Sequence, residues 1–106
     1  MSSIQPLLPN QQAVITFVRR IAWALVDMPE QVLVEAVSDH HGTTIRLRVD
    51  PSDLGKVIGK QGRTARSLRI LLGAAGVTTS HRFTLDIEKN EGEQMKQDAL
   101  DMHPSS

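Results

Sequence analysis

Two glycines, Gly59 and Gly62, interrupt the helical apolar pattern that runs over residues 54–72. Glycine adopts backbone angles that are forbidden to other residues, and its missing Cβ atom lets a second backbone approach closely. Two polar residues, Lys60 and Gln61, fill the positions between the glycines. The stretch therefore predicts two helices that meet at a tight polar loop, and the fold must be built around this pair.

Both helices of the pair have recognisable ends. Asp50 can cap the first helix and Asp53 favours the positive end of its dipole, which predicts a short helix over residues 51–58. The second helix is predicted over residues 63–75, because the next residue, Gly76, is a common helix terminator.

One helix and three strands make up the rest of the pattern. Apolar residues recur at helical spacing over residues 11–26, with Asn10 as the expected N-cap. The valine-rich residues 31–38 and the alternating residues 43–49 predict an antiparallel hairpin. Residues 82–88 alternate in the same way and predict a third strand.

The order helix, strand, strand, helix, helix, strand predicts a two-layer α+β domain. Alternation in the strands indicates a three-stranded sheet with one solvated face, so we expect three helices packed on the other face. We further expect a flexible lead over residues 1–10, one domain over residues 11–89, and an acidic, disordered tail over residues 90–106.

The charges are unevenly distributed, although twelve Lys and Arg residues balance twelve Asp and Glu residues. Residues 46–69 contain seven basic and two acidic side chains, whereas residues 86–106 contain six acidic and two basic ones. The middle of the chain can therefore attract a polyanion, and the tail would repel one. A surface whose charges serve only solvation is the alternative interpretation.

Composition and motifs argue against several classes of function. The chain has no Cys, which excludes disulfides, thiolate catalysis and Cys-based zinc sites, and its four His residues show no metal-binding spacing. Neither a catalytic set of side chains nor a complete P-loop is found, so we expect no enzyme and no cofactor. The first residues do not resemble a secretory signal and no apolar run could span a bilayer, so we expect a cytoplasmic protein.

The loop between the glycines precedes a helix N-terminus, where unpaired N–H groups and the helix dipole attract anions. Lys60 adds a mobile positive charge and Gln61 adds a neutral hydrogen-bonding group. On the helix that follows, Arg63, Arg66 and Arg69 spread over about 120° of arc, opposite an apolar face. This arrangement favours binding of a phosphodiester backbone, and a ligand-free turn between helices is the alternative.

The run V-I-G-K-Q-G at residues 57–62 resembles the V-I-G-x-x-G motif of the KH domain. The order of elements resembles the type II, prokaryotic arrangement of this domain. The small size and the run D-P-S-D-L-G-K-V-I-G-K-Q-G-R-T-A resemble the small bacterial proteins of the KhpA family, over about residues 11–89. The resemblance implies RNA binding without catalysis, by an RNA chaperone that acts with a larger multidomain KH protein of the KhpB type. In some bacteria that pair is linked to cell elongation and envelope synthesis.

The resemblance also implies which residues hold RNA. KH domains clamp the backbone of about four nucleotides in the G-x-x-G loop, and the bases lie in a shallow apolar groove beside it. Val57 and Ile58 match groove positions. Lys56, Arg63 and Arg66 match no invariant position, but local geometry places them near the phosphates. The expected RNA-binding residues are therefore Lys56, Val57, Ile58, Gly59, Lys60, Gln61, Gly62, Arg63 and Arg66.

Apolar residues on the second helix of the pair suggest a protein contact. Ile70 and Ala74 fall on the arginine side of the helical wheel, and Leu71 borders them. A domain of this size buries little surface, so association through such a patch would stabilise it. We expect these three residues to form a homodimer interface or to pair with a KhpB-type protein. Two other functions stay open: a KH-fold protein-interaction subunit with little RNA binding of its own, and a ribosome-assembly factor.

Overall fold

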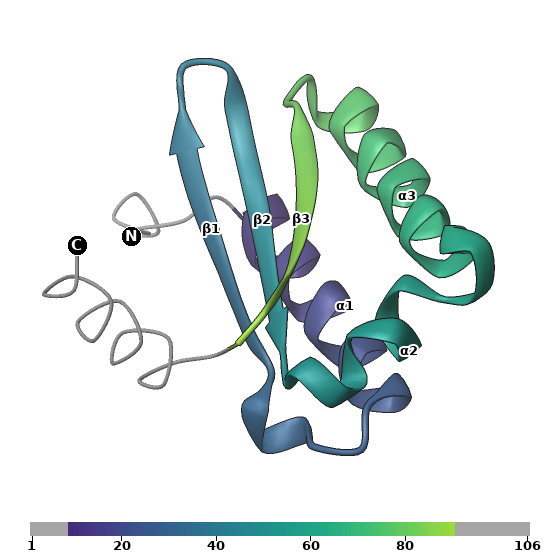
Figure 1. Cartoon of the computed structure of the whole chain (residues 1–106). Coiled ribbons are helices and arrows are strands. Elements are labelled where there is room, and N and C mark those ends of the chain that lie inside the picture. Colours follow the sequence, from purple (N-terminus) through teal and green to yellow (C-terminus); the bar gives the residue numbers. More distant parts are fainter. Residues whose placement is uncertain (1–8, 91–106) are drawn as a thin grey trace, which may run out of the picture.

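The computed structural model describes residues 9–90, and its elements follow the expected order (Figure 1). Residues 1–8 of the expected lead (1–10) and residues 91–106 of the expected tail (90–106) lie outside the described residues. The α-helices and strands are, in chain order, α1 (Pro9–Leu25), β1 (Leu33–Asp39), β2 (Gly42–Val49), α2 (Leu54–Ile58), α3 (Arg63–Thr79) and β3 (Phe83–Lys89). The helix predicted over residues 51–58 is divided into a 3-10 turn, Pro51–Asp53, and α2.

Within residues 9–90 the sheet has three strands in the order β1-β2-β3. β1 and β2 form the expected antiparallel hairpin, in which Leu33 is opposite Arg48 and Asp39 is opposite Gly42. β3 runs parallel to β2, because α2 and α3 return the chain to the end of the sheet where β2 begins. In Figure 1, α1 passes behind the sheet and α3 runs beside β3.

An aliphatic core fills the space between the sheet and the helices. Alternate residues of β2 are fully buried toward the helices, and the intervening ones are half-buried on the outer face. This pattern confirms the predicted α+β architecture with one solvated sheet face. The buried apolar residues are Val14, Ile15, Val18, Ala22, Ile45, Leu47, Val49, Val57, Ala65, Leu68, Leu72, Phe83 and Leu85.

One arginine on the outer face of the sheet forms ion pairs with both neighbouring strands. Arg48 lies between two carboxylates, with nitrogen–oxygen distances of 3.8 Å to Glu35 and 3.3 Å to Glu88. Arg46 is opposite Glu35 on β1 and Asp86 on β3 in the strand register. Both arginines belong to the basic middle of the chain, but acidic neighbours balance them. The remaining positive charge of that segment is carried by α2, α3 and the loop between them.

α3 continues to Thr79, so the prediction that Gly76 ends this helix was wrong. Gly76 is buried inside the helix, and a Cβ atom at this position would clash with the carbonyl oxygen of His81. The helix ends at Ser80, whose φ of 56° and ψ of 39° are left-handed, and the N–H of His81 donates to the Gly76 carbonyl at 2.9 Å. Glycine is therefore needed here for close packing against the approach to β3.

The two ends of the domain also differ from expectation. α1 begins at Pro9, because proline fits the first helical turn, where no N–H partner is needed, and Asn10 therefore lies inside the helix. Asn90, which the sequence assigned to the tail, is bonded to the domain. Its N–H donates to the Val49 carbonyl at 2.7 Å, and its Nδ2 donates to the Gln31 carbonyl at 2.9 Å.

Candidate nucleic-acid interface

Residues 59–62, which we call the GXXG loop, adopt a conformation that requires glycine at both ends. Gly59 has φ of 84° and Gly62 has φ of 74°. Gln61 also has a positive φ of 57°, which is uncommon for a residue with a Cβ atom. The N–H of Gly59 donates to the Gly55 carbonyl at 2.9 Å, and the N–H of Gly62 donates to the Gly59 carbonyl at 3.0 Å. The loop is therefore a tight, hydrogen-bonded turn.

The two glycines differ in their surroundings. A Cβ atom on Gly59 would lie 2.8 Å from the Cβ atom of Thr64 and 2.9 Å from its backbone nitrogen, too close for any side chain. A Cβ atom on Gly62 would meet no atom of the described chain within 4 Å. Gly59 is thus required by its backbone angle and by its packing against α3. Gly62 is required by its angle alone and leaves the surface of the loop open.

The GXXG loop adjoins the N-terminus of α3, where the positive end of the helix dipole is not balanced by an acidic side chain in the first turn. Among the described residues no side chain caps this helix, and its first turn contains no acidic residue. The N–H groups of a first helical turn attract anions. Lys60, Gln61, Arg63 and Arg66 are all exposed here, and Nη2 of Arg63 donates to Oε1 of Gln61 at 3.2 Å. The structure thus gives the loop a positively charged border.

A buried carboxylate anchors α2 and therefore the start of the loop. Asp53 is fully buried, and its two carboxylate oxygens accept the backbone N–H groups of Asp27 at 3.1 Å and Met28 at 3.0 Å. The ammonium of Lys56 lies 3.3 Å from Asp53 and 3.2 Å from the exposed carboxylate of Asp27. This cluster ties the beginning of α2 to the connection between α1 and β1.

The charges in this cluster stabilise one another. Burial raises the pKa of Asp53, but the N–H donors of Asp27 and Met28 and the Lys56 ammonium together lower the pKa below its ordinary value of 3.8. Asp27, which has the larger effect, and Asp53 raise the pKa of Lys56 above its ordinary value of 10.5. Lys56 is therefore a charged residue that already has two carboxylate partners, which distinguishes it from Lys60.

Val57 and Ile58, the two expected groove residues, lie in different environments. Val57 is fully buried in the core, where its side chain holds α2 against the sheet and the long helices. Ile58 is half-buried beside the loop. Of this pair, only Ile58 presents apolar surface next to the GXXG loop.

The apolar residues expected at a protein contact are exposed on α3. Ile70 is 64% exposed, Leu71 is 51% exposed, and Ala74 is also exposed. Leu71 borders a hollow of about 270 Å³ between α1 and α3, into which α1 contributes the exposed ring of Phe17. Phe17 was not singled out by its sequence pattern, because its helical spacing is also that of a core residue.

Sequence patterns also missed the role of Asp53. Its position near a helix start suggested only an interaction with the helix dipole. The Asp27 and Met28 N–H groups that it accepts lie 26 and 25 residues earlier in the chain, and no local pattern links them. The available signal was the spacing of Asp53 and Lys56, three residues apart, which permits an ion pair.

Within residues 9–90, no cluster of metal-binding side chains is found, and no helix has the length and apolar character needed to cross a membrane.

A mixed sheet with helices on one face, and a G-x-x-G loop between α2 and α3, together define a KH domain of type II. A family model described as KhpA/KhpB, KH domain, matches residues 15–87, and the chain belongs to this family.

Named relatives agree with this assignment, and a solved structure shares the fold. The RNA-binding protein KhpA of Halalkalibacterium halodurans is 51% identical over 72 residues, which cover 68% of this chain and 95% of the relative. The RNA-binding protein KhpA of Caldanaerobacter subterraneus is 46% identical over 70 residues, covering 66% of this chain and 93% of the relative. A crystal structure of an Era variant from Aquifex aeolicus superposes with a TM-score of 0.50 at 19% identity, over 78% of this chain and 32% of Era. This last likeness concerns the fold alone.

Proposed function

We propose that this protein binds single-stranded RNA, without catalysis, by clamping the sugar–phosphate backbone in the GXXG loop. The observation that supports this most strongly is the loop itself. Its glycines take positive φ angles, its two central side chains are exposed, and it leads into an uncapped helix N-terminus with no acid in the first turn. The names of the KhpA relatives, which describe RNA-binding proteins, support the same function.

Each site residue has a definite role in this proposal. Gly59 holds the turn against α3, the open backbone at Gly62 lets the RNA phosphates approach closely, and the side chains of Lys60 and Gln61 bind them. Arg63 and Arg66 add positive charge along the exposed side of α3. Ile58 supplies apolar surface for a base. Val57, through the core, and Lys56, through its ion pairs with Asp27 and Asp53, hold α2 in position.

RNA affinity should fall steeply with salt. Neutralising phosphates on a single strand releases counterions, and the slope of log K against log salt is about −0.7 for each phosphate. With about four phosphates in the clamp, affinity should decrease about 50-fold between 50 and 200 mM salt. Fluorescence anisotropy with a labelled random-sequence RNA pool measures this slope. A slope near zero would contradict binding through the phosphates.

We further propose that the protein acts in the cytoplasm as an RNA chaperone, as a homodimer or with a KhpB-like partner, in cell elongation and envelope homeostasis. The exposed apolar surface of Ile70, Leu71 and Ala74, together with Phe17, favours a protein contact. The same surface also favours the second candidate function, a KH-fold subunit that works chiefly through protein interaction. A role in ribosome assembly would use the same RNA contacts and differ in its target.

Leu71→Asp should convert an associated protein to monomer, because a carboxylate in an apolar interface loses its hydration without gaining a partner. Light scattering should report the monomer mass for this variant and a larger mass for the wild type. Val37→Asp is the matched control, since Val37 is 48% exposed on the outer face of the sheet. If Leu71→Asp remains folded and keeps the wild-type mass, the interface does not lie on α3.

A further inference from the structure

The residues that follow β3 are acidic, and the described part of the chain fixes the point at which they begin. Residues 91–106, which we call the acidic tail, contain four acidic side chains and one lysine. The N–H of Asn90 donates to the Val49 carbonyl at 2.7 Å, and its Nδ2 donates to the Gln31 carbonyl at 2.9 Å. The tail therefore leaves the domain beside the end of β2. Its acidic residues are Glu91, Glu93, Asp98 and Asp101.

The tail begins at the end of the domain that carries α2 and the GXXG loop. β3 is parallel to β2, with Lys89 opposite Val49, so the two strands end together, and β2 leads through Pro51–Asp53 into α2 (Figure 1). Gly59 lies at most about 30 Å from Val49, because the path between them runs through two short helices that rise only about 2.0 and 1.5 Å per residue. The extended tail spans about 50 Å, at about 3.3 Å per residue, so it is long enough to reach the loop.

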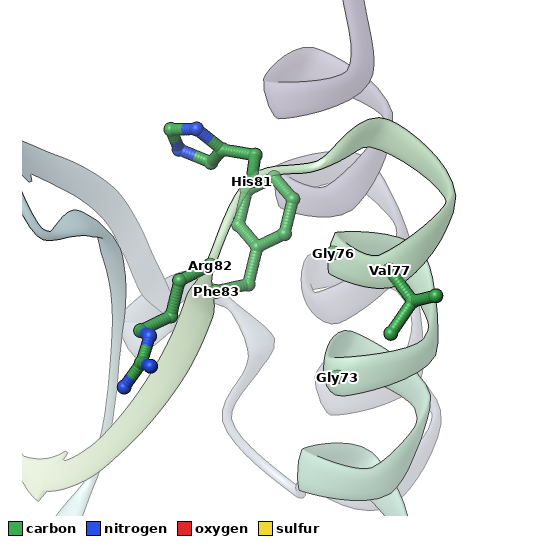
Figure 2. A pocket seen from close by; sticks show the side chains of 6 residues that line it. All are labelled: Gly73, Gly76, Val77, His81, Arg82 and Phe83. Atoms are coloured by element: carbon green, nitrogen blue, oxygen red, sulfur yellow. The ribbon is translucent and has the colours of Figure 1, made fainter.

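The unpaired positive charge of the domain is concentrated at the loop and on the first half of α3. Residues 54–85 contain no acidic side chain, and α3 contains no charged residue beyond Arg69. In the hollow of about 310 Å³ between the C-terminal half of α3 and β3, Figure 2 shows the Arg82 side chain pointing away from the helix. Lys56 already has two carboxylate partners. The basic residues of this surface that form no ion pair within residues 9–90 are Lys60, Arg63, Arg66 and Arg69.

Carboxylates can bind this surface through the contacts that a phosphate would use. Within residues 9–90 no side chain caps the first N–H groups of α3, and such groups attract carboxylates as well as phosphates. Arginine binds both anions through the same pair of parallel N–H···O bonds. Exposed ion pairs are individually weak, but covalent linkage raises the effective concentration of the tail at the loop to about the millimolar range. Several weak pairs formed together therefore suffice to occupy the loop.

We propose that the acidic tail docks on the GXXG loop and the first turns of α3 when RNA is absent, and that it competes with RNA for this surface. The competition rests on the proposed function, whereas the docking can be observed without RNA. Because the contacts join exposed charges, salt should screen them and release the tail. The tail should therefore weaken RNA binding most at low salt.

The first test neutralises the tail in the full chain and measures anisotropy of a fluorescein-labelled, ten-nucleotide random-sequence RNA pool. Glu91, which adjoins the domain, is left unchanged. The tail-neutral variant should bind RNA about fivefold or more tighter than wild type at 50 mM salt, and the difference should vanish near 500 mM. The substitutions of this variant are Glu93→Gln, Asp98→Asn and Asp101→Asn.

A charge-matched control neutralises three exposed acids on β1 and β3 instead. It changes the net charge of the chain by the same amount, so a general electrostatic effect would strengthen RNA binding equally in both variants. We expect the control to stay within about twofold of wild type, because isolated exposed charges have small effects. Its substitutions are Glu35→Gln, Asp39→Asn and Asp86→Asn.

The second test detects the docking directly and needs no RNA. The chain has no Cys, so Ala99→Cys gives a single attachment site for a nitroxide label between Asp98 and Asp101. The label should broaden the backbone NMR signals of residues 60–66 at 50 mM salt, and either 500 mM salt or added RNA should restore them. The same label on the tail-neutral chain should leave these signals sharp.

The outcomes separate the docking from the proposed function. Sharp signals of residues 60–66 with the labelled wild-type tail would overturn the docking. RNA affinity that is unchanged in the tail-neutral variant, or that rises equally in its control, would overturn the competition, while RNA binding by wild type upholds the proposed function. Absence of RNA binding by both wild type and the tail-neutral variant would overturn the proposed function, and the competition with it.

Discussion

Asp53→Ala is expected to lower the melting temperature of the domain by about 10 °C or more. The change removes the acceptors of the Asp27 and Met28 N–H groups and one of the two carboxylates that bind Lys56. Donors left unpaired inside a structure cost more than the original hydrogen bonds contribute, because they have lost water without gaining a partner. Thermal unfolding followed by far-UV circular dichroism measures the shift.

Asp27→Asn is the matched control for this prediction. Asp27 shares Lys56 with Asp53, but its side chain is 77% exposed, and exposed ion pairs contribute little to stability. The melting temperature of Asp27→Asn should stay within about 2 °C of wild type. Similar melting temperatures for Asp53→Ala and wild type would contradict the view that this carboxylate anchors α2.

Asp53 also predicts how stability depends on pH. Its pKa in the folded protein is lower than the ordinary value of 3.8, so around pH 4 the unfolded chain binds more protons than the folded one. The stability that Asp53 contributes is therefore present in full above the unfolded pKa and is lost as the pH falls through the lowered folded pKa. Asp53→Asn, which cannot titrate, should lose this part of the acid sensitivity that wild type shows in chemical denaturation.

The anchor matters for function because α2 contains only the five residues Leu54–Ile58 and cannot be stable on its own. Tertiary contacts of Asp53, Lys56 and the buried Val57 hold it in place. Since Gly59 follows directly, these contacts also set the position of the GXXG loop. A loss of RNA binding on mutation of Asp53 would thus arise through the loop, without any contact between Asp53 and RNA.

Local patterns predicted the helices and strands well because strand alternation, helical spacing and helix caps depend on residues that are close in sequence. The predicted cap at Asp50 is confirmed, since its side chain accepts the N–H of Ser52 at 3.0 Å. Contacts between distant segments were not predictable in this way. Gly76 has the sequence signal of a helix end, but glycine is needed there because His81 packs closely against it. Asp53 has the sequence signal of a residue that interacts with the helix dipole, but its carboxylate accepts hydrogen bonds from the connection between α1 and β1.

In the candidate site, too, local features were predictable from the sequence and contacts between distant segments were not. The glycines, Lys60 and Gln61 were identifiable from sequence because the turn and the helix start are local features. The burial of Val57 and the engagement of Lys56 depend on how α2 packs, which the sequence of α2 does not show. The unequal roles of Lys56 and Lys60 therefore emerge only from the structure.

The double variant Lys60→Asp with Gln61→Asp is expected to weaken RNA binding about 100-fold or more. Two exposed groups that would bind phosphate become carboxylates that repel it, at the point where the helix N-terminus would hold the anion. The fold should survive, because Lys60 and Gln61 are exposed and aspartate accepts the left-handed angles of residue 61 better than most side chains do.

Gln12→Asp with Arg20→Asp is a charge-matched control, because it makes the same changes at exposed positions of α1. Both double variants alter the net charge equally, so a general electrostatic effect would weaken both alike. Circular dichroism spectra matching wild type establish that each variant is folded.

Anisotropy of a labelled single-stranded RNA pool, titrated with wild type and these two folded double variants at low salt, tests the central claim most directly. We predict binding by wild type and by the α1 variant, and loss of binding by the loop variant. Binding by the loop variant that equals wild type would contradict the GXXG loop as the RNA clamp.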